Sequence, residues 1–180
     1  MKGLSLSLML LFGLILSLAG QSEKKLFIGI QPDITREIKN NEEKVFSVNV
    51  FPLVVQYYAM EEISLRISPI VNLQSDINSF SNLGAQFAMP LYLFPNRENL
   101  LRGLFTAPLV GISRNVATAS NEITCAVEPG YSWILPGGFS MNLGAQLGAT
   151  YFTADDVNQG WRNHTGIKFS LGYTFLGAKD

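Results

Sequence analysis

The chain has 180 residues, of which 47% are hydrophobic and 15% are charged, and its formal net charge at pH 7 is −1. A chain so close to neutrality is a poor partner for nucleic acid, and no nucleic-acid partner is expected. The single cysteine, Cys125, excludes an internal disulfide.

The N-terminus has the pattern of an export signal. Lys2 precedes an almost wholly apolar run over 4–18, and small residues at 17 and 19 suit a cleavage site. This run is shorter than the roughly 20 residues that a membrane-spanning helix needs. Gln21 stands where a lipoprotein would carry its acylated cysteine. We expect a cleaved signal peptide over 1–20 and one domain over 21–180.

Eight segments of this domain have the composition and alternation of β-strands. A clear example lies at 140–151, where Met, Leu, Ala and Tyr alternate with Ser, Asn, Gly, Gln and Thr. Alternate side chains of a strand point to opposite faces, so one face is apolar and the other is small and polar. In chain order, the predicted strands are 25–31, 45–58, 63–73, 80–94, 104–114, 123–135, 139–152 and 165–175.

The connections between these strands fall into two predicted sets. The connections 59–62 and 136–138 are short and 95–103 is moderate, whereas 32–44, 74–79, 115–122 and 153–164 are mostly longer and more polar. Outer-membrane barrels have short periplasmic turns and longer outer loops. Aromatic residues are predicted to form two girdles at the strand ends. One girdle has Tyr57, Tyr58, Tyr92, Phe94, Trp133, Tyr173 and Phe175, and the other has Phe46, Phe80, Tyr151 and Phe152.

These features predict an all-β fold, an eight-stranded antiparallel up-and-down transmembrane β-barrel. The chain resembles the small outer-membrane barrels of the OmpA, OmpX and OmpW type over about 25–175. The resemblance implies an outer-membrane location, with membrane lipids and lipopolysaccharide as neighbours. The last strand, 167–175, resembles the aromatic-ended strand that the barrel-assembly machinery reads, although the chain continues over 176–180.

Three charged residues are predicted to point into the lumen by the parity of their strands: Arg66, Glu128 and Lys168. Buried charges need partners, so we expect these three to form a network. Such a network could act as a plug or as a gate for small ions, and the plug is favoured because a barrel of eight strands is narrow.

Five prolines lie inside predicted strands, where each removes a donor from the hydrogen-bond ladder. They lie at similar distances from the predicted periplasmic turns, which suggests a ring at one level. A row of β-bulges would explain them. The alternative is a lateral seam through which hydrophobic molecules pass between lumen and lipid, as a resemblance to the lipid A palmitoyltransferase and OmpW barrels implies. The five are Pro52, Pro69, Pro90, Pro108 and Pro129.

Catalysis has little support in the sequence. His164 could join Asp155, Asp156 and a serine in a hydrolase or acyltransferase site, but a solvated loop position is the favoured interpretation. The two adjacent acids alone could attract a divalent cation, which is a weak signal. No nucleophile elbow, metal cluster, phosphate loop or dinucleotide motif appears, so no cofactor is expected. Cys125 is predicted to face lipid.

The favoured function is therefore non-enzymatic, either structural or a surface interaction through the outer loops. The alternatives are the binding or lateral passage of a small hydrophobic ligand, and a soluble exported barrel of the lipocalin kind.

Overall fold

The structure of the protein is a computed structural model that describes residues 25–38, 44–60, 62–74, 79–93, 103–116, 119–153 and 159–175. The predicted signal peptide over 1–20 lies outside the described residues. Within the described ranges the secondary structure is entirely β. These ranges hold no helix that is long and apolar enough to cross a membrane.

The strands cover most of the described chain, and each predicted strand is present. In chain order they are β1 (Lys25–Ile30), β2 (Asp33–Ile38), β3 (Lys44–Asn49), β4 (Leu53–Tyr58), β5 (Ser64–Gln74), β6 (Ser79–Ala88), β7 (Leu91–Tyr92), β8 (Gly103–Asn115), β9 (Asn121–Ile134), β10 (Phe139–Thr153) and β11 (Gly160–Phe175).

These segments build eight barrel strands, because three of the strands are interrupted. β1 and β2 form the first, β3 and β4 the second, and β6 and β7 the fourth. Each barrel strand pairs antiparallel with the next, and the first also pairs with β11, the last. The sheet is thereby closed, which confirms the predicted eight-stranded antiparallel up-and-down barrel.

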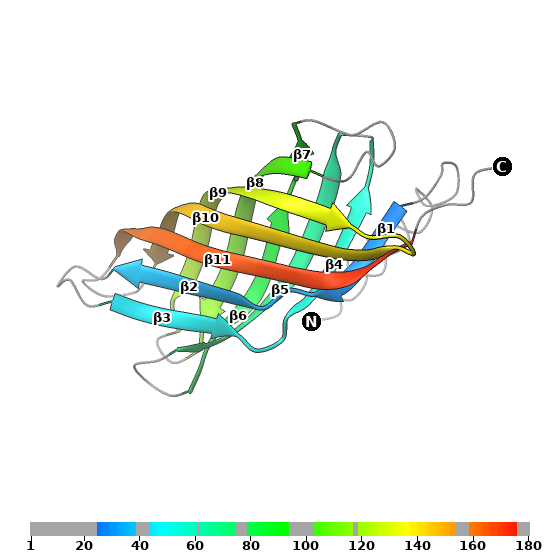
Figure 1. Ribbon diagram of the computed structural model, residues 1–180. Coiled ribbons are helices and arrows are strands. Elements are labelled where there is room, and N and C mark those ends of the chain that lie inside the picture. Colours follow the sequence, from blue (N-terminus) through cyan, green and yellow to red (C-terminus); the bar gives the residue numbers. More distant parts are fainter. Residues whose placement is uncertain are drawn as a thin grey trace, which may run out of the picture.

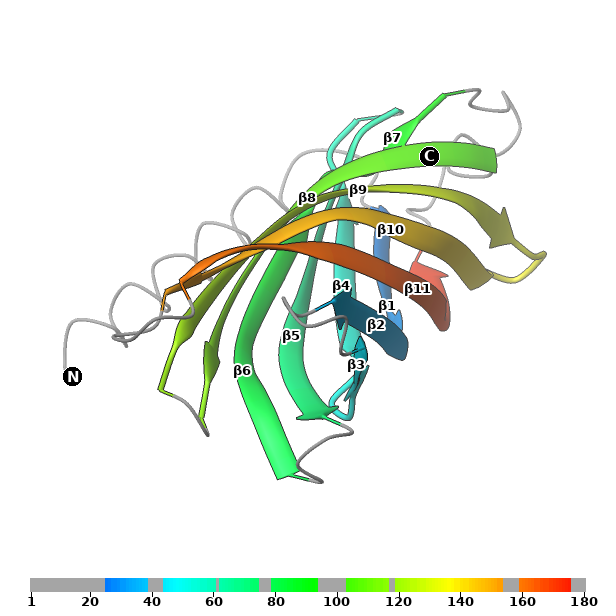
Figure 2. The same cartoon turned by 90° about the vertical axis from the view of Figure 1, so that its left-hand side faces the viewer.

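The strands are strongly inclined, as closure of so few strands requires. In Figure 1, β3, β2, β11, β10, β9 and β8 follow one another across the face turned to the viewer. Figure 2 shows β8 to β11 arching over β4, β5 and β6, which form the opposite wall.

The two faces of the wall differ in the way that the alternation predicted. On β10, Gln146 is 1% exposed and points inward, whereas the neighbouring Leu147 is 60% exposed. On β11, Lys168 is 2% exposed and Ile167 is 64% exposed. A folded soluble protein has the opposite distribution, with large apolar side chains inside and charges outside.

Several strands extend into the segments predicted as loops. β2 occupies 33–38 of the predicted connection 32–44, and β11 begins at Gly160 inside the predicted connection 153–164. The predicted first strand ends before Pro32, yet the Pro32 carbonyl accepts a hydrogen bond from Phe169 N and the ladder resumes beyond it. The connections left at that end are 39–43, 75–78, 116–120 and 154–159. These connections are not consistently longer than those at the opposite end of the barrel, so the predicted difference in loop length between the two ends is wrong.

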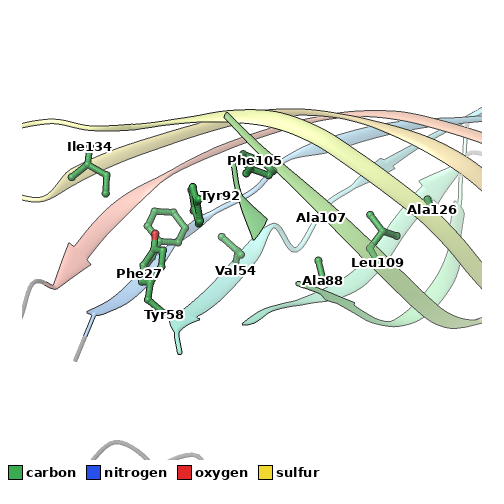
Figure 3. Close-up of a cluster of buried hydrophobic side chains, with 10 residues drawn as sticks. All are labelled: Phe27, Val54, Tyr58, Ala88, Tyr92, Phe105, Ala107, Leu109, Ala126 and Ile134. Atoms are coloured by element: carbon green, nitrogen blue, oxygen red, sulfur yellow. The ribbon is translucent and has the colours of Figure 1, made fainter. Parts of the chain in front are cut away.

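Part of one predicted aromatic girdle lies inside the barrel instead. Tyr58 and Tyr92 are buried, with ring centroids 6.4 Å apart, and Tyr92 lies 5.9 Å from Phe105. Figure 3 shows these rings with Phe27 in a cluster of buried side chains. Tyr57 and Tyr58 are adjacent in a strand, so only one of them can face outward. Phe152 also points inward and is buried.

The remaining girdle positions with described side chains lie on the outer face or at strand ends. Ring pairs form there between Tyr151 and Trp161 at 5.1 Å and between Tyr173 and Phe175 at 5.0 Å. Phe94 and the side chain of Phe80 lie outside the described part.

Candidate functional site

The centre of the lumen is crossed by an ion pair between two predicted residues. Arg66 Nη2 on β5 lies 2.6 Å from Glu128 Oε1 on β9, and both side chains are almost inaccessible to solvent. These are the third and the sixth of eight barrel strands, so the pair bridges opposite parts of the wall. Gln146 Nε2 donates to the second carboxylate oxygen of Glu128 at 3.0 Å.

A second group surrounds Lys168, the third predicted lumen charge. Its Nζ lies 3.6 Å from Asp33 Oδ2 and also donates to Gln86 Oε1. These partners come from the first and the fourth barrel strands, so this group crosses the lumen as well. Sequence reasoning missed Asp33 because it follows Pro32, in a segment predicted as a loop.

His164 belongs to the lumen and not to a loop, which corrects the favoured prediction for this residue. It is buried, and its Nε2 lies 3.1 Å from Gln146 Oε1 while its Nδ1 lies 3.4 Å from Thr150 Oγ1. Its place on β11 follows from the extension of that strand to Gly160. The other members of the candidate catalytic group, Asp155 and Asp156, lie outside the described residues.

Further polar groups fill the lumen toward the end that carries 154–159. Glu122 accepts hydrogen bonds from Asn82 and, at 3.3 Å, from Ser113 Oγ. The guanidinium of Arg162 stacks 3.9 Å above the ring of Phe152. Glu122 falls in a predicted loop, but it lies on β9 and is 4% exposed.

The opposite end of the lumen is closed by the aromatic cluster together with hydrogen-bonded polar side chains. Gln56 Nε2 donates to Ser64 Oγ at 2.8 Å and to the Tyr92 hydroxyl at 3.1 Å. Ser140 and Thr174 share a hydroxyl hydrogen bond of 2.6 Å. The described lumen therefore holds several groups of hydrogen-bonded side chains, which suits a filled interior.

The five prolines do not follow a single row. Pro52 O accepts from Gln31 N beside the break in the first strand, and Pro69 O accepts from Asn49 Nδ2 at the break in the second strand. Pro90 lies next to Pro108, whose carbonyl accepts from Met89 N. Pro69 pairs with Ala85, five residues before Pro90, so the prolines form two groups in the pairing of the inclined strands. The ring at one level stays a prediction. Pro129 pairs with Thr106, close to the second group.

The first proline group coincides with a gap in the ladder between the second and third barrel strands. Residue pairing stops after Asn49↔Asn72, where Val50 N still donates to Val71 O at 2.8 Å, and it resumes at Val55↔Ile67. Asn49 bridges this gap: its Oδ1 accepts from Phe51 N at 3.1 Å and Val71 N at 3.3 Å, and its Nδ2 donates to Pro69 O at 2.9 Å. The sequence carried no direct signal for this bridging role.

A groove of about 670 Å³ lies on the wall beside the break at Pro32. It crosses β3, β2, β11 and β10, which are adjacent in the face shown in Figure 1. Its apolar lining consists mostly of outward side chains, and at Gly166 it reaches Gln146 and Asp33 of the lumen. Its outer members include Ile34, Arg36, Phe46, Val48, Ala145, Leu147, Ile167 and Phe169.

No protein-family profile matches the sequence, and no curated protein matches it either. Among solved structures, the chain is similar to a de novo designed protein, TMB2.3, determined by solution NMR. The two share 10% identity with a TM-score of 0.38, over 87% of this chain and 98% of the designed one.

Proposed function

We propose that the protein is a non-enzymatic transmembrane β-barrel of the outer membrane in a Gram-negative-type cell envelope, with a structural role. The observation that carries this proposal is the distribution of side chains across the wall. Leu147 and Ile167 are more than half exposed on the outside, whereas Glu128 and Lys168 are almost wholly buried inside. Lipid is the solvent in which such an outer face is stable.

The filled lumen favours a plug over a gate or an ion path. The Arg66–Glu128 pair and the Lys168 group each join strands on different sides of the lumen. Breaking a buried ion pair by removing one partner is strongly unfavourable, so both groups resist opening. A barrel with a plugged lumen does not conduct ions. Its role in the membrane is then structural, or is an interaction made by its outer connections.

The resemblance to the OmpA, OmpX and OmpW barrels supports the same location. It suggests lipopolysaccharide and the other outer-membrane lipids as neighbours, and the barrel-assembly machinery as the partner during insertion. The last strand, β11, supports this because its terminal Tyr173 and Phe175 form an aromatic pair on the outer face.

Gel mobility in isolated outer membranes, with and without boiling, tests the proposal. A folded barrel resists detergent and migrates differently from its boiled form, so a heat-dependent shift is expected in that fraction. Recovery in the soluble periplasm without any shift would overturn the proposal and would favour a soluble exported barrel of the lipocalin kind.

A surface-interaction role through the outer connections is the other part of the proposal. The described strands reach far toward these connections, with 15 residues in β10 and 16 in β11. About 9–11 residues span a bilayer, so these strands can project beyond it. Replacing 154–158 by a short Gly-Ser linker should abolish binding to cells while the heat-dependent gel shift remains. Unchanged binding would remove this connection from the proposal.

A second candidate function is the lateral passage of small hydrophobic molecules, favoured by the ladder gap at Asn49. If the gap is the route, replacing Pro69 with Val restores a ladder donor and should reduce uptake of a fluorescent naphthylamine by whole cells. Pro129→Val, in the other proline group, is the matched control and should leave uptake unchanged. Equal uptake in both variants and the unaltered protein would exclude this route.

A further inference from the structure

We infer that the groove across β3, β2, β11 and β10 is a binding site for one anionic lipid of the surrounding bilayer. The acyl chain lies along the apolar lining, and the negatively charged headgroup pairs with Arg36. This inference rests on the proposed membrane location, because the groove opens on the outer face of the wall.

The lining has the shape and chemistry for a hydrocarbon chain. Ile34, Leu147 and Ile167 are each more than half exposed along its sides, and the small side chain of Ala145 adds depth between them. The volume of about 670 Å³ lies within the roughly 300–1,000 Å³ typical of small-molecule sites. In a bilayer, lipid chains are the molecules available to fill such a groove.

Arg36 supplies the feature that selects an anion. It lies on the same face of β2 as the outward Ile34 and lines the groove with it. Its Nε is buried and has no hydrogen-bond partner in the described part of the chain. In those same ranges Arg36 makes no ion pair. A guanidinium without an ion-pair partner is unfavourable on a lipid-facing wall, and a phosphate or carboxylate of a lipid headgroup would offset its charge.

The position of Arg36 along the wall also fits a headgroup. Arg36 pairs with Thr165, and Trp161 of the aromatic pair with Tyr151 lies four residues away on β11. Aromatic rings of this kind mark the membrane–water interface. The nearest acid in the groove, Asp33, lies 3.6 Å from Lys168 and is thereby offset, so it does not compete for Arg36.

Native mass spectrometry of the detergent-purified barrel tests this inference. The probes are dioleoylphosphatidylglycerol and dioleoylphosphatidylcholine, which have the same chains but differ in net charge. One phosphatidylglycerol should be retained preferentially by the unaltered protein, and Arg36→Gln should reduce that preference roughly five-fold, as expected for one arginine at a membrane surface.

Two control variants, Arg114→Gln and Ala149→Phe, separate lipid binding in the groove from general effects of charge and side-chain size. Arg114→Gln removes another outward arginine, which does not line the groove, and should leave the preference intact. Ala145→Phe should fill the groove and reduce retention of both lipids, whereas Ala149→Phe, outside the lining, should not. Added inorganic phosphate should not displace the lipid, because it has no chain.

The outcomes also distinguish this inference from the membrane proposal. Equal retention of both lipids, or an equal loss in Arg36→Gln and Arg114→Gln, would overturn the lipid site. Each sample is first checked for its heat-dependent gel shift in outer membranes. A shift without lipid preference removes only the lipid site, whereas absence of the shift in the unaltered protein removes the membrane proposal itself.

Discussion

Arg66 Nη2 lies 2.6 Å from Glu128 Oε1, and the two residues belong to β5 and β9 on different sides of the barrel. The ion pair links two parts of the wall across a lumen that is otherwise filled by hydrogen-bonded side chains. Because both side chains are buried, each charge needs the other to offset the cost of its desolvation.

Removing only one member of this pair should destabilise the barrel strongly. Arg66→Met leaves Glu128 buried without its cation, and the free energy of unfolding should fall by about 3–5 kcal/mol. The measurement is urea unfolding of the barrel refolded in lipid vesicles.

The double variant Arg66→Met, Glu128→Gln is the control for that prediction. The amide introduced by Glu128→Gln is neutral, and its oxygen can still accept from Gln146, so the double variant should recover most of the lost stability. A single variant as stable as the unaltered protein would show that the pair makes no contribution.

Asn49 should be more important than an ordinary polar residue because its side chain replaces missing ladder bonds. Asn49→Ala removes contacts to Phe51 N, Val71 N and Pro69 O, and it should cost about 2 kcal/mol of unfolding free energy. Asn163→Ala, at an exposed position of β11, should change stability by less than about 0.5 kcal/mol. Equal effects in the two variants would contradict the bridging role.

Close strand contact at Gly148 should exclude any side chain there. A Cβ at this position would lie 2.2 Å from the Cys125 carbonyl oxygen and 2.5 Å from Ala126 Cβ, so Gly148→Ala should destabilise the barrel by about 1–3 kcal/mol. Gly111→Ala is the matched control, since its nearest contact would be 3.4 Å from Thr124 Cβ. Comparable unfolding curves for the two variants would contradict the claim that Gly148 has less room for a side chain than Gly111.

Cys125 offers a direct measurement of the environment of the outer wall. Its side chain is exposed on β9, so in a membrane it should resist both a small uncharged maleimide and a charged thiosulfonate, because hydrocarbon disfavours the thiolate that attacks either reagent. Both reagents should react after unfolding, as measured by intact mass. Met60→Cys in a Cys125→Ala background, at an exposed turn, should react with both reagents when folded. Rapid reaction of folded Cys125 with the charged reagent would contradict a lipid-facing wall.

Much of the architecture was predictable because alternation is a local property. The period of two along 140–151 assigns Leu147 to one face and Gln146 to the other without knowledge of any neighbour. The same parity placed Arg66, Glu128 and Lys168 on the inner face. Parity also requires that the adjacent residues Tyr57 and Tyr58 face opposite sides of the wall. The predicted girdle wrongly included both.

The sequence by itself therefore determined the strand character, the two faces of the wall and the residues available to fill the lumen. Only the tertiary structure decided which residues meet: Arg66 with Glu128, Lys168 with Asp33, and Asn49 with Pro69. It also decided that β2 and β11 continue into segments that have the composition of loops. The physical reason is that strand pairing is non-local. A residue such as Asp33 or His164 becomes part of a strand when the partner strand presents its hydrogen-bonding groups, and the local pattern around it does not contain that information.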